Sequence, residues 1–311
     1  MLIRAITTSA LCLLLITGQT VQADAQDRRQ AKRIHDRLTG TPPSDIVLNA
    51  METALISDST GKSAAEIALL DPGFYNVTLK NFAAPWTNEA QSVFEPLNDY
   101  TATVIGMVRD ETPFNQLFSL DYVYAAPDLG SVSPISPDNN DHYLDLEADG
   151  VDLSDSDILK PVPQVSAVGL PNVGAEAGVL TTRAAARAFF IAGTNRAMFR
   201  FTMLNHLCND MEQVKDITRA PDRIRQDVSR SPGGDSRLFL NNCVGCHTGM
   251  DPMAQAFAYY NYPDVEDDQP GAIEYTPGNV QPKYFNNDLN FPQGGRTPND
   301  SWENYWRLGQ N

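Results

Sequence analysis

The residues with the clearest chemical potential in this chain are the cysteines and the histidine of Cys243-Val244-Gly245-Cys246-His247. C-x-x-C-H is the attachment signature of c-type haem, in which two thiols add across the haem vinyl groups and the imidazole ligates iron. Two cysteines three residues apart on one helical turn lie on the same side, and the next residue is carried toward the metal. The sequence therefore predicts one covalent haem c, attached at Cys243 and Cys246, with His247 as the proximal iron ligand.

Other interpretations of this motif are open. A dithiol redox site needs a strand before the motif and a helix that opens at the first cysteine, whereas the residues from Asp235 onward favour a short helical or irregular lead. Cys208, Cys243, Cys246 and His247 have the ligand types of a zinc site, but a histidine directly after a cysteine is poorly spaced for a tetrahedral cage. A chance occurrence without a cofactor is a further alternative.

The second axial ligand of the iron is harder to assign. No methionine follows Met253 and no histidine follows His247, so a ligand downstream on the far face is missing from this chain. Upstream, Met203 and His206 are three residues apart in a predicted helix over 196–214 and share a face. His206 is the leading candidate for the distal iron ligand and Met203 is the second. An absent ligand, or one outside this chain, is equally open.

The N-terminus has the pattern of a secretory signal peptide over residues 1–23. A short basic start with Arg4 precedes an apolar run from Ala5 to Ile16, and Val21-Gln22-Ala23 is a small-residue cleavage pattern. The protein is therefore expected in the periplasm or otherwise exported. The mature chain would keep Cys208 as an odd cysteine, which predicts a buried thiol, an intermolecular cross-link or a disulfide to a missing partner.

Composition limits the partners. The formal net charge of −16 over 311 residues argues against nucleic acid or anionic lipid and suits docking to a basic redox partner protein. No run after the signal peptide is long enough to form a transmembrane segment. The final residues from Trp306 resemble the opening of a helix, so we expect a haem domain that is truncated at the C-terminus.

Hydrophobic periodicity predicts a mainly α fold, with a helical N-terminal domain and a cytochrome c-like haem domain with long irregular loops. The predicted domains are a helical domain over 24–126, an acidic linker over 127–164 and a c-type haem domain over 165–311. His35 and His142 are expected to be solvated. The predicted helices cover residues 25–38, 46–57, 64–70, 99–110, 113–124, 183–190 and 196–214, whereas residues 74–95 are expected to be irregular.

The acidic linker contains half of a calcium-binding pattern. Asp145-Leu146-Glu147-Ala148-Asp149-Gly150 places oxygen ligands at alternate positions before a glycine at the turn. The second half fails, because Asp152 stands where an apolar residue is usual and Ser156 replaces the bidentate glutamate. The sequence therefore favours a solvated linker over a calcium site.

An ordered set of short segments resembles planctomycete-type cytochrome-like secreted proteins of unknown function that carry C-x-x-C-H-x-x-M-D-P. The segments are 37–43, 109–117 with 121–122, 178–181, 195–196 with 204–208, and 243–252. The resemblance implies a periplasmic haem protein and little about mechanism. Met253-Ala254-Gln255 departs from the Gly-containing continuation that the family implies.

Electron transfer through the bound haem is the predicted function, because the sequence shows no distal group of catalytic residues. The first alternative is a haem enzyme that acts on peroxide or oxygen with His206 or Arg196 as a distal group. The second is a protein whose N-terminal domain binds a partner or polymer, with an auxiliary haem.

Overall fold

The computed structural model describes residues 26–171, 174–191, 193–218, 232–263, 265, 269–284 and 297–304. Within these residues helix accounts for 52% and strand for 5%, which confirms the predicted mainly α class. No helix in this part of the chain is both long and apolar enough to cross a membrane. The predicted signal peptide over 1–23 lies outside the described residues.

The chain separates into two compact units. One comprises the chain up to Asn81 together with Asp152–Ser154, and the other comprises Phe82–Val151 and the chain from Asp155 onward. This division differs from the boundary predicted at residue 126. Residues 82–126 pack with the second unit, because they include the helix around which that unit is built.

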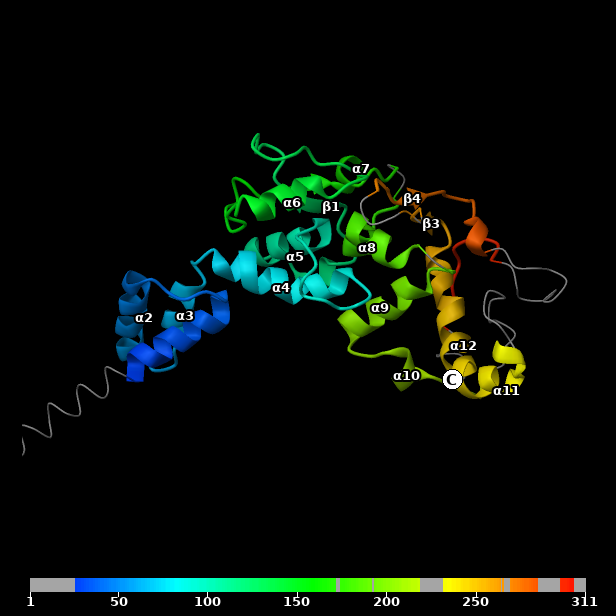
Figure 1. Ribbon diagram of the computed structural model, residues 1–311, viewed down its shortest axis with the longest axis horizontal. Helices are drawn as coiled ribbons and strands as arrows, with labels where there is room; N and C mark the ends of the chain where they lie inside the picture. The colour runs from blue at the N-terminus through cyan, green and yellow to red at the C-terminus, as the bar shows by residue number, and fades with distance from the viewer. Residues whose placement is uncertain are drawn as a thin grey trace, which may run out of the picture. The chain divides into compact units, whose positions relative to one another are not determined.

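The first unit begins with a helix over residues 26–39, followed by α2 (Asp45–Ser57) and α3 (Lys62–Ala68) (Figure 1). Ser44 caps α2, since its hydroxyl accepts a hydrogen bond from the Val47 amide at 3.3 Å. Ala31, Met51 and Ala64 are among the fully buried residues of the small core between these helices.

His35 is fully buried in this unit, so the expectation that it is solvated is wrong. Its Nδ1 lies 3.0 Å from the Thr41 carbonyl oxygen and its Nε2 lies 3.3 Å from an Asp71 carboxylate oxygen. These polar neighbours allow the imidazole to be buried. The first part of the segment expected to be irregular is helical, with a π-helix over Phe74–Leu79, α4 (Lys80–Ala83) and a 3-10 turn over Ala84–Thr87, whereas residues 88–95 contain no helix.

The second unit is built around α5 (Asp99–Arg109), in which nine of the 11 residues are buried. Asn98 caps this helix by accepting a hydrogen bond from the Thr101 amide at 3.0 Å. Gly106 lets a strand approach closely, because a Cβ at this position would lie 2.2 Å from the Tyr124 ring. That strand, β1 (Tyr122–Ala125), replaces the end of the helix predicted over 113–124.

Apart from Asp152–Ser154, which belong to the first unit, the acidic stretch is part of this unit and is not a solvated linker. It contains α6 (Asp141–Ala148), and its end forms β2 (Lys160–Pro163), which pairs antiparallel with β1. His142 is buried, contrary to the prediction, because its Nε2 accepts a hydrogen bond from the Ala126 amide and its Nδ1 lies 2.7 Å from the Ser133 carbonyl oxygen. The alternation of acidic and apolar residues thus reflects an amphipathic helix.

Two carboxylates of the calcium pattern accept hydrogen bonds from backbone amides. A carboxylate oxygen of Asp145 accepts a hydrogen bond from the Ser133 amide, and one of Glu147 accepts from the Leu97 amide. No three His, Cys, Asp or Glu side chains come together as a metal-binding group in the described residues.

The remaining elements of the second unit include the helices that carry the C-x-x-C-H motif. Helix α9 contacts both α8 and α12 (Figure 1). These elements are α7 (Gln164–Ala167), a 3-10 turn (Gly178–Thr181), α8 (Arg183–Phe189), α9 (Arg196–Leu207), α10 (Met211–Val214), α11 (Ser236–Leu238), a π-helix (Phe239–Cys243), α12 (Val244–Met253), β3 (Tyr260–Asn261) and β4 (Glu274–Tyr275).

Candidate functional site

The C-x-x-C-H motif lies within an unbroken helical run, α11 through α12. Asp235 caps the start of the run, because its carboxylate accepts a hydrogen bond from the Arg237 amide at 2.9 Å. Cys243 stands at the end of the π-helix and His247 in the first turns of α12. A helix precedes the first cysteine, so the strand that a dithiol redox motif requires is not present here.

One side of the motif helix is covered by the chain that follows α10. A Cβ on Gly245 would lie 3.0 Å from the Ile217 side chain, so the glycine permits close packing. The Asp216 amide donates to the Gly245 carbonyl oxygen at 3.0 Å, and the Thr248 hydroxyl donates to the Asp216 carbonyl oxygen at 3.2 Å. Val244 is buried on this helix as well.

The three residues that carry the chemistry are only partly buried. Cys243, Cys246 and His247 all have intermediate exposure, and both cysteines are free thiols. Their accessibility differs from that of the intervening residues of the helix, which are buried. A cofactor can therefore reach the two thiols and the imidazole without unfolding the helix.

A buried carboxylate fixes the orientation of the histidine. His247 Nδ1 lies 3.0 Å from an oxygen of Asp251, whose side chain is 0% exposed. A carboxylate only accepts hydrogen bonds, so this pair directs the Nδ1 proton to Asp251 and leaves Nε2 with its lone pair. Sequence reasoning did not assign a role to Asp251, although its i,i+4 spacing from His247 on a helix was a usable signal.

Cys246 borders an apolar cluster rich in methionine. Phe199 and Met203 of α9, Met211 of α10, and Met250 and Ala254 after the motif form its buried part. Cys246 and Met253 pack against this cluster, and burial raises the pKa of the Cys246 thiol. The structure therefore places Met203, the second candidate for the distal ligand, in the same cluster as one attachment cysteine.

His206, the leading candidate from the sequence, has a different environment. Its Nε2 lies 2.8 Å from the Tyr100 hydroxyl, and its ring makes edge contacts with Trp86 and Phe118 at centroid distances of 5.0 and 4.9 Å. Burial in this aromatic group lowers the pKa of His206 to about 4. The nitrogen that would ligate iron thus has a protein partner in this structure.

Cys208 does not join the motif cysteines. It caps the C-terminus of α9 in the left-handed conformation, with φ of 53°, and is an exposed free thiol. This residue also breaks the helix that was predicted over 196–214. The zinc interpretation, which needs Cys208 beside the motif, has no support among the described residues, where no metal-binding group of three side chains forms.

The residues present fit a covalent haem. The two thiols and the imidazole have the required types and spacing on one helical turn, they are accessible, and the carboxylate of Asp251 holds the ring nitrogen that would not bind iron. The apolar cluster beside Cys246 supplies thioether and aromatic side chains of the kind that pack against a porphyrin.

Comparisons of the chain with protein-family models, with curated proteins and with solved structures found no match.

Proposed function

We propose that the protein is an exported c-type haem protein that transfers electrons. Haem would be attached through thioethers to Cys243 and Cys246, with Nε2 of His247 as the proximal ligand. The observation that carries this proposal is the accessible C-x-x-C-H turn with its imidazole held by buried Asp251. A haem bound there would supply a one-electron iron couple.

The protein's own residues would set the properties of that couple. Asp251 accepts a hydrogen bond from the Nδ1 N–H and thereby increases the basicity of the His247 imidazole, which would favour the oxidised metal. Met250, Phe199 and Met203 exclude water near Cys246, and a low local polarity favours the reduced, less charged state. The reduction potential would reflect the balance of these two opposing effects.

The neighbourhood of Cys246 supports Met203 as the distal ligand in preference to His206. Met203 belongs to the apolar cluster that Cys246 contacts, and a thioether is a soft ligand suited to haem iron. His206 would have to give up its hydrogen bond to Tyr100 and leave its contacts with Trp86 and Phe118.

One observation favours a second candidate function, a haem enzyme acting on peroxide or oxygen. The hydrogen bond from His247 to buried Asp251 makes the imidazole more electron-donating, a property that assists cleavage of an O–O bond. The Arg196 guanidinium, named above as a distal group, lies 3.4 Å from the Thr194 hydroxyl.

The family resemblance stays a prediction and is consistent with this proposal. The predicted signal peptide would deliver the chain to the compartment where c-type haem is attached. The net charge of −16 supports a redox partner protein with a basic docking face.

The test is production of the mature chain in a periplasm that attaches c-type haem, followed by denaturing electrophoresis with haem staining and by absorption spectra. Covalent haem in the native sequence is expected to be lost in Cys243→Ser with Cys246→Ser. Cys208→Ser is the matched control, since it removes an exposed thiol outside the motif and should retain the haem. Absence of covalent haem in the native sequence would overturn the proposal.

Addition of carbon monoxide or cyanide separates the two candidate functions. A low-spin haem that ignores both ligands supports electron transfer, and Met203→Leu should then convert it to a high-spin haem that binds them. A native haem that is already high-spin and binds both would put the enzyme function first.

A further inference from the structure

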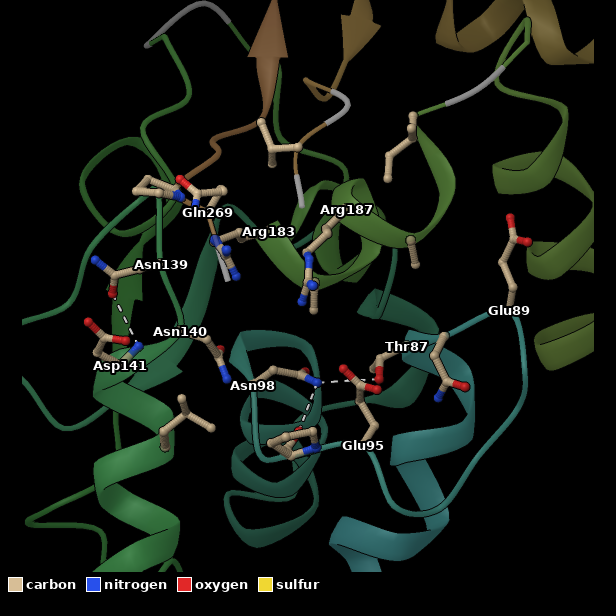
Figure 2. A pocket seen from close by; sticks show the side chains of 18 residues that line it. Thr87, Glu89, Glu95, Asn98, Asn139, Asn140, Asp141, Arg183, Arg187 and Gln269 are labelled. Carbon is tan, nitrogen blue, oxygen red and sulfur yellow. Dashed lines mark hydrogen bonds between the residues drawn. The ribbon is translucent and has the colours of Figure 1, made fainter. Parts of the chain in front are cut away.

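A second site is present in the same unit, in a cavity with a volume of about 770 Å³. Its walls come from the start of α5, the start of α6, helix α8 and the loop before α5, so segments far apart in sequence converge on it (Figure 2). None of the C-x-x-C-H residues lines it. A cavity of this size accommodates a small organic ligand.

Two arginines from one face of α8 define the positive side of the cavity. Arg183 and Arg187 are four residues apart, so they lie on the same side of the helix. Arg183 is only 8% exposed, and its Nε donates to the Gly271 carbonyl oxygen at 3.2 Å. Figure 2 shows the Arg187 side chain extending from α8 toward the side that carries Asn98 and Glu95.

Hydrogen bonds to Asp99 of α5 fix the position of the start of α8. The buried Asp99 carboxylate accepts hydrogen bonds from the Arg183 amide at 2.5 Å and from the Ala184 amide at 3.1 Å. These bonds satisfy free amides in the first turn of α8. The two guanidinium groups are therefore presented by a helix that is tied to the core, which limits the cost of ordering them around a ligand.

The other walls are rich in groups that recognise hydroxyls. Glu89, Glu95 and Asp141 supply carboxylates, and Asn140 retains an amide oxygen while its Nδ2 donates to the Leu97 carbonyl oxygen at 2.8 Å. Carboxylate and amide oxygens accept hydrogen bonds from hydroxyls. The lining contains no aromatic side chain in the part of the chain that the structure describes.

The charges select among anionic ligands. A guanidinium binds a carboxylate through two parallel hydrogen bonds. Three carboxylates on the other walls would repel a doubly charged phosphate, whereas a singly charged acid with several hydroxyls would donate hydrogen bonds to them. We propose that this cavity binds a sugar acid, with its carboxylate on Arg187 beside Arg183 and its hydroxyls on the acidic and amide walls.

The proposal is tested by calorimetric titration of the full mature chain, with its haem if attached. The probes are galacturonate, galactose, which lacks the carboxylate, and acetate, which lacks the hydroxyls. Galacturonate is expected to bind with a Kd at or below about 1 mM. Galactose should bind at least about tenfold more weakly, and acetate should show no saturable binding, because each lacks one half of the recognition.

Variants connect this binding to the cavity. Arg187→Gln should weaken galacturonate binding by roughly 10- to 100-fold, and Arg187→Lys should weaken it less because the charge remains. Arg33→Gln, at an exposed position in the first unit, makes the same charge change and should leave the affinity unaltered. Thermal unfolding checks that each variant is folded.

Several results would overturn the proposal. These are equal affinity for galacturonate and galactose, binding of acetate as tight as that of galacturonate, no saturable binding of galacturonate, or an unchanged affinity in folded Arg187→Gln. If Arg187→Gln does not fold, the comparison of the three probes on the native chain decides the question alone.

Discussion

Met203 and His206 of α9 have different environments although they are only one helical turn apart. Met203 lies among thioether, aromatic and thiol groups next to the C-x-x-C-H motif, whereas His206 lies among Tyr100, Trp86 and Phe118. The first environment is soft and apolar, and it borders the helix that carries Cys246. The second environment provides a hydrogen-bond partner for His206 and surrounds its ring with aromatic side chains.

This difference teaches that ligand type alone does not identify an axial ligand. Histidine is the commoner metal ligand, and that preference put His206 first from the sequence. Under the proposed function, the neighbours of each side chain favour Met203 over His206, because a nitrogen that already has a buried partner must lose it before binding iron.

The largest effect on stability is expected from truncating the Met203 side chain. Met203→Ala should lower the free energy of unfolding by about 2–4 kcal/mol, because it leaves a cavity in a buried cluster. Urea unfolding of the haem-containing protein measures this. Met203→Leu keeps the volume and should cost less than about 1.5 kcal/mol while altering the haem spectrum. An unaltered spectrum in Met203→Leu would remove Met203 as a ligand.

A smaller effect on stability is expected from removing the hydrogen bond between His206 and Tyr100. Tyr100→Phe should lower the free energy of unfolding by about 1–2 kcal/mol, because it leaves His206 Nε2 without its partner. The haem spectrum should be unaffected, which absorption spectroscopy checks. A spectral change as large as that of Met203→Leu would return His206 to the role of distal ligand.

The pH dependence of stability sharpens the same comparison. The folded-state pKa of His206, about 4, lies below its ordinary value of 6.5, so protonation opposes folding. The contribution of neutral His206 to the free energy of unfolding is fully present above pH 6.5 and is lost as the pH falls through 4. This loss is about 1–2 kcal/mol after allowing for screening by water. His206→Gln should flatten this part of the curve of unfolding free energy against pH. An unchanged slope in that variant would assign the acid sensitivity to another group.

The smallest effect is expected on the outer surface of α9. Arg200 donates to both oxygens of Asp210, at 2.8 and 2.7 Å, and its side chain is 45% exposed. Arg200→Gln should lower the free energy of unfolding by about 0.5 kcal/mol or less at moderate salt, because water screens the pair. Thermal unfolding at low and high salt checks this, and a loss above about 2 kcal/mol would indicate a structural role.

The sequence by itself determined the features that depend on local chemistry. The C-x-x-C-H spacing defined the candidate site, and the helices predicted over 46–57 and 99–110 begin within a residue of α2 and α5, because helical periodicity is a local property of the sequence. The predicted mainly α class followed from the same local periodicity.

Tertiary structure decided the features that depend on distant partners. His142 is buried because Ala126 and Ser133 supply its hydrogen bonds, and residues 122–125 are a strand because residues 160–163 pair with them. Neither partner is visible in a local window of sequence.

The difference between local and distant partners also explains which residues of the two candidate sites could be recognised from the sequence. Cys243, Cys246 and His247 are neighbours in sequence, so their pattern could be recognised there. The side chains around Cys246, the partner of His206, and the cavity below α8 are brought together only when α5, α8, α9 and α12 pack. Long-range packing has no fixed spacing along the chain, so only the folded protein places Met203 beside the haem motif and His206 beside Tyr100.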